Sequence, residues 1–183
     1  NDDKIDGFIV QLPLPNHIDE EEVLMTVNPN KDVDGFHPSN FGKMALNMES
    51  FIPATPYGII ELLKRYEINT SGKNTVVIGR SNIVGRPISI LLSRKGNPGD
   101  STVTLVHSRT KNLESFTKNA DIIVSALGVP DFLKSEMVKK GVIIIDVGIT
   151  RVKDDSNSKG YVIKGDVDFE SVKEKASFIT PVP

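Results

Sequence analysis

The sequence predicts an α/β fold in which helices cover both faces of a parallel sheet, and three observations indicate it. From residue 55 onward, short apolar strands alternate with helical segments, which is the order expected of a parallel sheet. The strand segments are rich in Val and Ile on both faces, as buried parallel strands are. The first strand runs through glycine into a helix, in the stretch VVIGRSNIVGRP at residues 76–87. We therefore expect a Rossmann-like, doubly wound parallel sheet.

The composition limits the classes of partner that this chain is expected to bind. Its 183 residues include 38% hydrophobic residues, enough for a real core, and 22 basic against 24 acidic residues give a formal net charge of −2. This balance offers no electrostatic case for nucleic acid or for an anionic membrane surface, so neither partner is predicted. No apolar run is long enough to span a bilayer. The absence of cysteine excludes disulfides and Cys-ligated zinc and agrees with a cytoplasmic location. The three histidines lack metal-ligand spacing, so no metal is expected.

Residues 1–55 differ in character from the rest. Residues 6–15 form a strand-like run that breaks at Pro13 and Pro15, a short helix is expected over 19–27, and residues 28–43 are rich in turn formers. This region contains few core residues for its length, too few for an independent domain. We expect this region to be the remainder of a smaller α/β domain packed against a second domain at 56–183; an irregular N-terminal extension is the alternative.

The second region begins with a helix over residues 55–68, with Thr55 as its N-cap and Pro56 at its first helical position. Residues 153–160 are polar and predict an exposed hairpin loop near the end of the sheet. The other elements expected are strands at 74–79, 101–107, 121–128 and 142–148, and helices at 84–95, 111–119 and, as a single turn, 135–141.

The turn between the first strand and its helix is a candidate phosphate site. A helix that starts just after glycine presents unpaired N–H groups and the positive end of its dipole, where a diphosphate can bind. Gly79, Arg80, Ser81 and Gly85 form this turn. It departs from G-x-G-x-x-G because Ser81 replaces the second glycine and the next glycine comes later. Similar turns occur in α/β folds that bind nothing there.

The end of the second strand bears on the choice of dinucleotide. Folds specific for NAD place Asp or Glu near this point to bind the ribose hydroxyls, whereas this strand is followed by His107, Ser108 and Arg109. Together with Arg80 from the first turn, these residues would present hydroxyl and guanidinium donors to a 2′-phosphate. NADP is therefore favoured over NAD, although the two arginines could also be ordinary solvated surface residues.

A resemblance to one family extends almost over the whole chain. The sequence resembles the bifunctional methylenetetrahydrofolate dehydrogenase/methenyltetrahydrofolate cyclohydrolases of one-carbon metabolism. Many separate blocks in the same order are far more specific than one glycine motif. The blocks that carry the resemblance are DGFIVQLPLP, NPNKDVDGFHPSNFGK, PATPYGIIELL, VVIGRSNIVGRP, VTLVHSRT, ADIIVSALG, IIIDVGI, GDVDF and ITPVP.

The resemblance implies that residues 1–55 are the remainder of a smaller, folate-binding catalytic domain, with the folate site in a cleft between the two domains. Gln11 matches a catalytic glutamine that lies beside the reacting one-carbon unit and holds a catalytic lysine in place. Asp34 matches an aspartate that binds the pterin ring, and Leu12, Pro13 and Gly35 would contact the substrate. From the residues alone, Gln11 could instead satisfy turn amides, and Asp34 before glycine could be a simple turn residue.

The resemblance also implies the cofactor contacts and the chemistry. NADP would be bound by Gly79, Arg80, Ser81, Gly85, His107, Ser108, Arg109, Gly128, Gly148 and Ile149. The implied reactions are oxidation of methylenetetrahydrofolate by NADP⁺ and hydrolysis of the methenyl product to formyltetrahydrofolate, supplying one-carbon units for purine biosynthesis in a cytoplasmic homodimer.

In two respects the sequence departs from the family. Its Tyr-x-x-x-Lys pattern, whose lysine serves the hydrolysis, does not occur upstream of Gln11, and the glycine-rich segment that follows TPVP in the family is also absent. We expect that the chain is truncated at both ends, and that these 183 residues alone lack cyclohydrolase activity and bind both ligands poorly. Two alternatives are a non-catalytic nucleotide-binding homologue and another NADP-dependent dehydrogenase that acts on a small acid.

Overall fold

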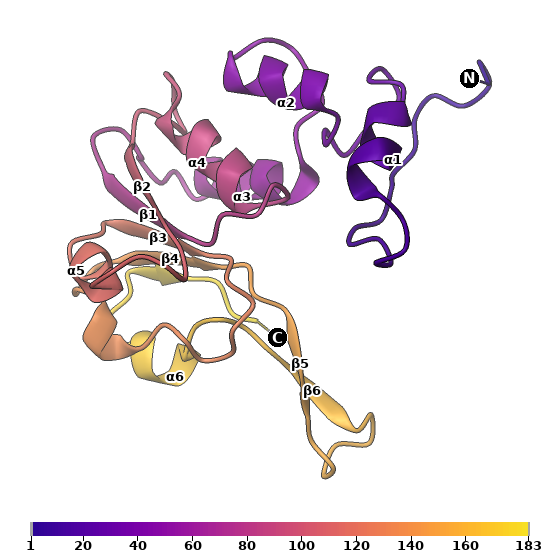
Figure 1. The fold of residues 1–183 in the computed structure, drawn as a ribbon. Coiled ribbons are helices and arrows are strands. Elements are labelled where there is room, and N and C mark those ends of the chain that lie inside the picture. The colour runs from indigo at the N-terminus through magenta and orange to yellow at the C-terminus, as the bar shows by residue number, and fades with distance from the viewer. Residues whose placement is uncertain (1, 183) are drawn as a thin grey trace.

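A computed structural model describes residues 2–182, in which most helices lie beside a central parallel sheet (Figure 1). The helices are α1 (Glu20–Thr26), α2 (Pro38–Ala45), α3 (Ala54–Arg65), α4 (Gly85–Ser93), α5 (Leu113–Thr117), the 3₁₀ helix η1 (Ser135–Met137) and α6 (Phe169–Val172). The strands are β1 (Asn74–Ile78), β2 (Thr102–Val106), β3 (Ile122–Ser125), β4 (Ile143–Asp146), β5 (Thr150–Lys153), β6 (Tyr161–Lys164) and β7 (Phe178–Ile179).

The main sheet has five parallel strands in the order β2-β1-β3-β4-β7. The chain enters it at β1, moves to the edge strand β2, and then crosses back to β3 on the other side of β1. The carboxyl ends of β1 and β3 therefore flank the point where the strand order reverses, which is where ligands bind in open α/β sheets. The predicted fold class is confirmed.

Both faces of the sheet are buried. Successive residues of a strand point to opposite faces, so neighbours in sequence belong to different clusters. Val77 and Val124 pack with α2, α3 and α4 in one cluster. Val76 and Ile123, their neighbours in sequence, pack in a second cluster on the other face, against the segments that contain α5 and α6. This alternation explains why the strand segments read as continuous apolar runs and not as alternating apolar and polar residues.

The helix α3 begins two residues earlier than expected, and its cap is different. Pro53 is the N-cap and Ala54 the first helical residue, so Thr55 lies inside the first turn and makes no side-chain cap. The prediction of Thr55 as N-cap is therefore wrong. Pro56 is still accommodated, because the first-turn residues of a helix need no intrahelical N–H donor.

The strand expected over residues 6–15 does not form. Only Phe8 makes a bridge, to Asp32, with its amide donating to Lys31 O at 2.9 Å. Ile5, Phe8 and Ile9 expose between 43% and 58% of their surface. Apolar β-branched residues are not sufficient for a strand, because a strand needs hydrogen-bonding neighbours along its length.

One helix in the N-terminal region was not anticipated, namely α2, which lies in the stretch predicted as turn-rich. Its first residue is Pro38, and the Nδ1 atom of His37 accepts a hydrogen bond from Ser39 N at 3.0 Å. The helix buries Asn40 and Met44. Its sequence signal was the His-Pro pair at the start, since proline is common at the first helical position.

The hairpin predicted around residues 153–160 is present. Strands β5 and β6 pair antiparallel and extend away from the main sheet (Figure 1). Arg151 lies over the ring of Tyr161, 4.9 Å from its centroid, and Lys164 pairs with Asp131 at the base of the hairpin. The hairpin forms a separate two-stranded sheet.

Candidate functional site

The carboxyl edge of the sheet brings together three of the predicted cofactor segments. Parallel pairing places Ile78 beside both Val106 and Ser125, so the loops that follow β1, β2 and β3 start side by side. The amide of Gly79 donates to Val106 O at 2.9 Å, and Ala126 N donates to Ile78 O at 2.8 Å. These hydrogen bonds fix the first residues of the three loops relative to one another.

Two glycines allow the first loop to close on itself. Gly79 has φ of +112°, and a Cβ there would lie less than 3.0 Å from Ala126 O. A Cβ on Gly85, the first residue of α4, would lie less than 3.0 Å from Gly79 O. Both positions therefore require glycine for backbone packing within the protein.

The amino end of α4 differs from expectation, because its N–H groups are not left unpaired. The Oγ atom of Ser81 accepts hydrogen bonds from Val84 N at 3.1 Å and Gly85 N at 3.3 Å. Arg86 N donates to Ser81 O at 3.0 Å, and Pro87 has no N–H. Ser81, in place of the second glycine of the common motif, supplies this cap. Its hydroxyl hydrogen is still available to donate to a ligand oxygen.

The turn after β2 is held by its own hydrogen bonds. His107 N donates to Thr110 Oγ1 at 2.9 Å, Thr110 N donates to His107 O at 2.8 Å, and Arg109 N donates to His107 Nδ1 at 3.2 Å. Because Nδ1 accepts, the ring proton of a neutral His107 is on Nε2. Ser108, Arg109 and Arg80 are exposed. Positive and hydroxyl donors thus border the ends of two adjacent strands.

The loop after β3 is bonded to a buried carboxylate that the sequence did not single out. Leu127 N and Gly128 N donate to Asp166 Oδ2 at 2.6 and 3.2 Å, and Val129 N donates to Asp166 Oδ1 at 3.0 Å. The side chain of Ser125 lies 3.3 Å from the same carboxylate. Gly128 itself is exposed, with φ of +74° and open space where a Cβ would lie.

The loop after β4 is organised by a second carboxylate, that of Asp146. It accepts from Gly148 N at 2.9 Å, from Asp166 N at 3.0 Å and from Val167 N at 2.9 Å. Burial raises the pKa of Asp146, against the effect of these backbone donors, and the neighbouring Asp166 raises it further. Gly148 is buried and the next residue, Ile149, is 75% exposed.

Three of the five predicted folate residues line a cavity of about 160 Å³ between the N-terminal region and the first glycine loop, and Pro13 and Gly35 do not. Gln11, Leu12 and Asp34 line it, and Ile83 from the loop before α4 lines it as well. Gln11 is exposed, and its amide nitrogen donates to Leu12 O at 3.1 Å. Pro13 is exposed and follows a cis peptide bond.

Asp34 and Gly35 lie in a turn that Asp32 organises. The buried Asp32 carboxylate accepts from Phe36 N, His37 N and Asn40 Nδ2 at 3.3, 2.8 and 2.9 Å. Gly35 is buried with φ of +68°, and a Cβ there would lie less than 3.0 Å from Phe51 O. Burial raises the pKa of Asp34, and the charge of Asp32 raises it further.

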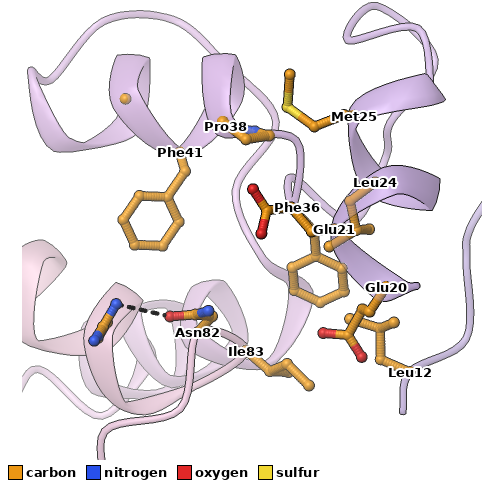
Figure 2. A pocket seen from close by; sticks show the side chains of 12 residues that line it. Leu12, Glu20, Glu21, Leu24, Met25, Phe36, Pro38, Phe41, Asn82 and Ile83 are labelled. Carbon is orange, nitrogen blue, oxygen red and sulfur yellow. Dashed lines mark hydrogen bonds between the residues drawn. The ribbon is translucent and has the colours of Figure 1, made fainter. Parts of the chain in front are cut away.

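A larger cavity of about 580 Å³ adjoins the same region between α1, α2 and the start of α4 (Figure 2). Leu12 and Ile83 contribute to both cavities. The lining is mainly apolar, with Glu20 and Glu21 on the side of α1 and Asn82 and Arg86 on the side of α4. The Arg86 guanidinium donates to Asn82 Oδ1 at 3.0 Å, the dashed bond in Figure 2.

Two family models match the chain. The model for the tetrahydrofolate dehydrogenase/cyclohydrolase NAD(P)-binding domain matches residues 53–183, and that for the catalytic domain of the same family matches residues 1–34. The chain belongs to the tetrahydrofolate dehydrogenase/cyclohydrolase family.

Relatives from several organisms support this membership. The bifunctional protein FolD of Flavobacterium johnsoniae is 76% identical over 182 residues, which cover 100% of this chain and 62% of the relative. A crystal structure of FolD, a methylenetetrahydrofolate dehydrogenase/cyclohydrolase from Campylobacter jejuni, has a TM-score of 0.90 at 50% identity, covering 100% of this chain and 61% of that one.

A third relative carries ligands. The Trypanosoma brucei methylenetetrahydrofolate dehydrogenase-cyclohydrolase, complexed with NADP and an inhibitor, has a TM-score of 0.90 at 39% identity. The match covers 97% of this chain and 60% of that chain. The present chain thus spans about 62% of the length of the curated relatives that it matches.

Within this family fold, the residues that sequence reasoning missed are the carboxylates that organise loops, namely Asp32, Asp146 and Asp166. Each is a strong acceptor for backbone amides. A weak signal existed, because Asp146 ends an apolar strand and Asp166 follows a glycine. Within residues 2–182, no group of three or more His, Cys, Asp or Glu side chains is arranged to hold a metal ion, and no helix is long and apolar enough to cross a membrane.

Proposed function

We propose that the full-length protein oxidises methylenetetrahydrofolate with NADP⁺ and hydrolyses the methenyl product to formyltetrahydrofolate. One observation carries this proposal: Gln11, Leu12 and Asp34 line the same cavity as Ile83, which belongs to the loop between β1 and α4. Residues that the family resemblance links to folate therefore adjoin a loop that it links to the dinucleotide. Hydride transfer needs both reactants held at this kind of junction.

The donor set at the strand ends supports NADP as the cofactor. Arg80, Ser108 and Arg109 are exposed and follow the neighbouring strands β1 and β2, and residues 107–110 contain no carboxylate that would repel a phosphate. Guanidinium and hydroxyl groups are suited to a 2′-phosphate. The family model describes an NAD(P)-binding domain, and a relative binds NADP. The nicotinamide would accept the hydride; the protein groups hold and orient the reactants.

On the folate side, the two proposed residues differ in their chemistry. The Asp34 carboxylate can accept two parallel hydrogen bonds from an amino-pyrimidine edge. The Gln11 amide can donate and accept without adding charge, which suits a residue beside a cationic one-carbon unit. Leu12, Pro13 and Gly35 complete the proposed substrate contacts.

The dehydrogenase assay on the full-length protein tests the proposal directly. Cofactor reduction is followed at matched NADP⁺ and NAD⁺, with and without methylenetetrahydrofolate. We expect reduction that requires the folate and prefers NADP⁺. A folded protein that reduces neither cofactor would favour the non-catalytic homologue. Reduction with a small hydroxy acid but not with folate would favour the other dehydrogenase.

Four further features remain predictions from the sequence and the resemblance. They are the division into a folate-binding region at 1–55 and a dinucleotide-binding region at 56–183, a homodimer, a cytoplasmic location, and a role in supplying purine biosynthesis. Sedimentation of the full-length protein tests the homodimer.

A further inference from the structure

The backbone of the loop after β3 is hydrogen-bonded to a single side chain, that of Asp166, from a distant part of the chain. Asp166 is completely buried and lies 37–39 residues further along the sequence than the three loop residues that it bonds. Its carboxylate accepts the amides of three successive residues, Leu127, Gly128 and Val129. Successive amides that converge on one anion form a concave, strongly bonded turn.

These bonds leave the opposite side of the loop accessible. The amide of Gly128 points to Asp166, while the residue itself is exposed and has nothing within 4 Å of the position a Cβ would take. A ligand can therefore approach the backbone of Gly128 closely. The position of that surface depends on where the Asp166 carboxylate lies.

Asp166 is in turn held by the loop after β4. Asp146 accepts from the backbone amides of Asp166 and Val167, and also from Gly148 N. A Cβ on Gly148 would lie less than 3.0 Å from the Asp166 carboxylate, so the fit between the two is close. The two carboxylates thus link the loops after β3 and β4, which carry Gly128 and Gly148.

We propose that Asp166 is a positioning residue for the dinucleotide: with Asp146 behind it, its carboxylate sets the loop 126–129 against the cofactor and so determines cofactor affinity. This inference rests on the proposed function, because it takes the carboxyl edge of the sheet as the NADP site. A carboxylate suits this role better than an amide because both of its oxygens accept hydrogen bonds.

The test compares two Asp-to-Asn variants of the full-length protein. Asp166→Asn keeps the size of the side chain but exchanges one acceptor oxygen for a donor that faces backbone N–H groups. The control is Asp121→Asn at the opposite, amino edge of the sheet. There the Asp121 carboxylate accepts from Asn74 N at 2.9 Å and pairs with Lys139 at 2.6 Å. Both variants lose native hydrogen bonds, but only one of them loses bonds to the cofactor loop.

We expect Asp166→Asn to raise the NADP⁺ dissociation constant about tenfold or more, since each unsatisfied buried donor is costly. Its KM for NADP⁺ should rise far more than its KM for the folate. Hydrogen exchange of the Gly128 and Val129 amides should be faster. In Asp121→Asn the NADP⁺ affinity and the exchange of these two amides should equal those of the wild type. A merely structural role would lower the melting temperature of both variants and leave the affinity of the folded protein unchanged.

Two outcomes would overturn the inference, and they are distinguishable. A wild-type protein that binds no NADP⁺ would overturn the proposed function and this inference with it. Wild-type binding together with unchanged affinity in folded Asp166→Asn would overturn the inference alone. If Asp166→Asn does not fold, Ser125→Ala removes only the hydroxyl group beside the carboxylate. We then expect a smaller rise, about two- to threefold, in the NADP⁺ dissociation constant; no rise would count against the inference.

Discussion

Gly85 at the start of α4 lies so close to Gly79, the residue after β1, that a Cβ on residue 85 would fall less than 3.0 Å from Gly79 O. The strand and the helix can meet at this distance only because residue 85 has no side chain. Gly85→Ala should therefore lower the free energy of unfolding by about 1–3 kcal/mol, since the backbone must shift to accept the methyl group. Urea denaturation measures this.

The matched control is Gly58→Ala, in the middle of α3. Gly58 is exposed, and nothing lies within 4 Å of its Cβ position. Alanine is the better helix former, so this variant should gain about 0.5–1 kcal/mol of stability. A Gly85→Ala protein as stable as the wild type would show that the loop yields easily.

Arg80 is the candidate that distinguishes the two dinucleotides. Arg80→Ala should weaken NADP⁺ binding about tenfold or more and leave NAD⁺ binding nearly unchanged, because only NADP⁺ carries a 2′-phosphate for the guanidinium to pair with. Titration of both cofactors measures the two dissociation constants. The control is Lys118→Ala, another exposed cation, which pairs with Glu114 on α5. Equal losses for both cofactors in Arg80→Ala would contradict the 2′-phosphate role.

The turn after β2 can be changed without breaking its hydrogen bonds, since Arg109 contributes only its backbone amide to them. Replacing Ser108 by Asp and Arg109 by Ala should shift preference toward NAD⁺. The new carboxylate can bind ribose hydroxyls and repels a 2′-phosphate. The ratio of kcat/KM for the two cofactors reports the shift. An unaltered ratio would show that this turn does not contact the ribose.

Asp34 should make folate binding sensitive to moderately acidic pH. Its pKa is raised above 3.8, by burial and then by Asp32. As the pH falls, the carboxylate is therefore protonated earlier than an ordinary Asp and stops accepting two hydrogen bonds. Affinity for a folate analogue should fall as the pH drops through that raised pKa. In Asp34→Asn the affinity should be lower at neutral pH and its dependence on pH flatter. A wild-type affinity that is constant down to pH 3.8 would refute this.

The pKa of Asp121 is shifted in the opposite direction, downward, and this makes the stability of the protein depend on pH. Its hydrogen bond with Lys139 is the main cause that lowers its pKa below 3.8. A depressed pKa means that the unfolded chain binds more protons between the folded pKa and 3.8. The stabilisation is thus present above 3.8 and is lost as the pH falls through the folded pKa. Because the pair is partly exposed, with 38% and 29% of the two side chains accessible, its contribution is modest.

Thermal unfolding of Asp121→Asn between pH 2 and pH 7 tests this. The variant should melt below the wild type at neutral pH, and the two melting temperatures should converge below pH 3.8. A difference that stays constant at all pH values would mean that the charge of Asp121 contributes nothing.

The parallel sheet could be predicted because its signals are local. Runs such as residues 74–79 and 142–148 are short, β-branched and apolar, and glycine separates the first from its helix. These properties depend only on neighbouring residues, and the four strands predicted between residues 74 and 148 all formed, with ends within three residues of the expected bounds. The run at residues 6–15 also contains apolar and β-branched residues but forms no strand, because pairing partners are not a local property.

The candidate site was likewise predictable only in part from the sequence. The blocks of sequence were sufficient to indicate the family and, through it, Gln11, Asp34 and the arginines after β1 and β2. They did not reveal that Ser81 caps α4, although its spacing to Val84 and Gly85 is short, because serine after glycine has several possible partners. The meeting of Gln11 with Ile83 at one cavity joins residues over seventy positions apart.

The sequence by itself determined the alternation of elements, the buried strands and the glycine turn, since each depends on residues within about one turn or strand. Only the tertiary structure decided that the Asp166 carboxylate bonds the loop after β3 and that the Asp146 carboxylate bonds the loop after β4. Apart from the bond from Gly148 N to Asp146, the hydrogen bonds of these two carboxylates reach over 20 to 41 residues in sequence. Such partners have no fixed spacing, because the chain between them is positioned by the packing of the sheet and not by local conformation.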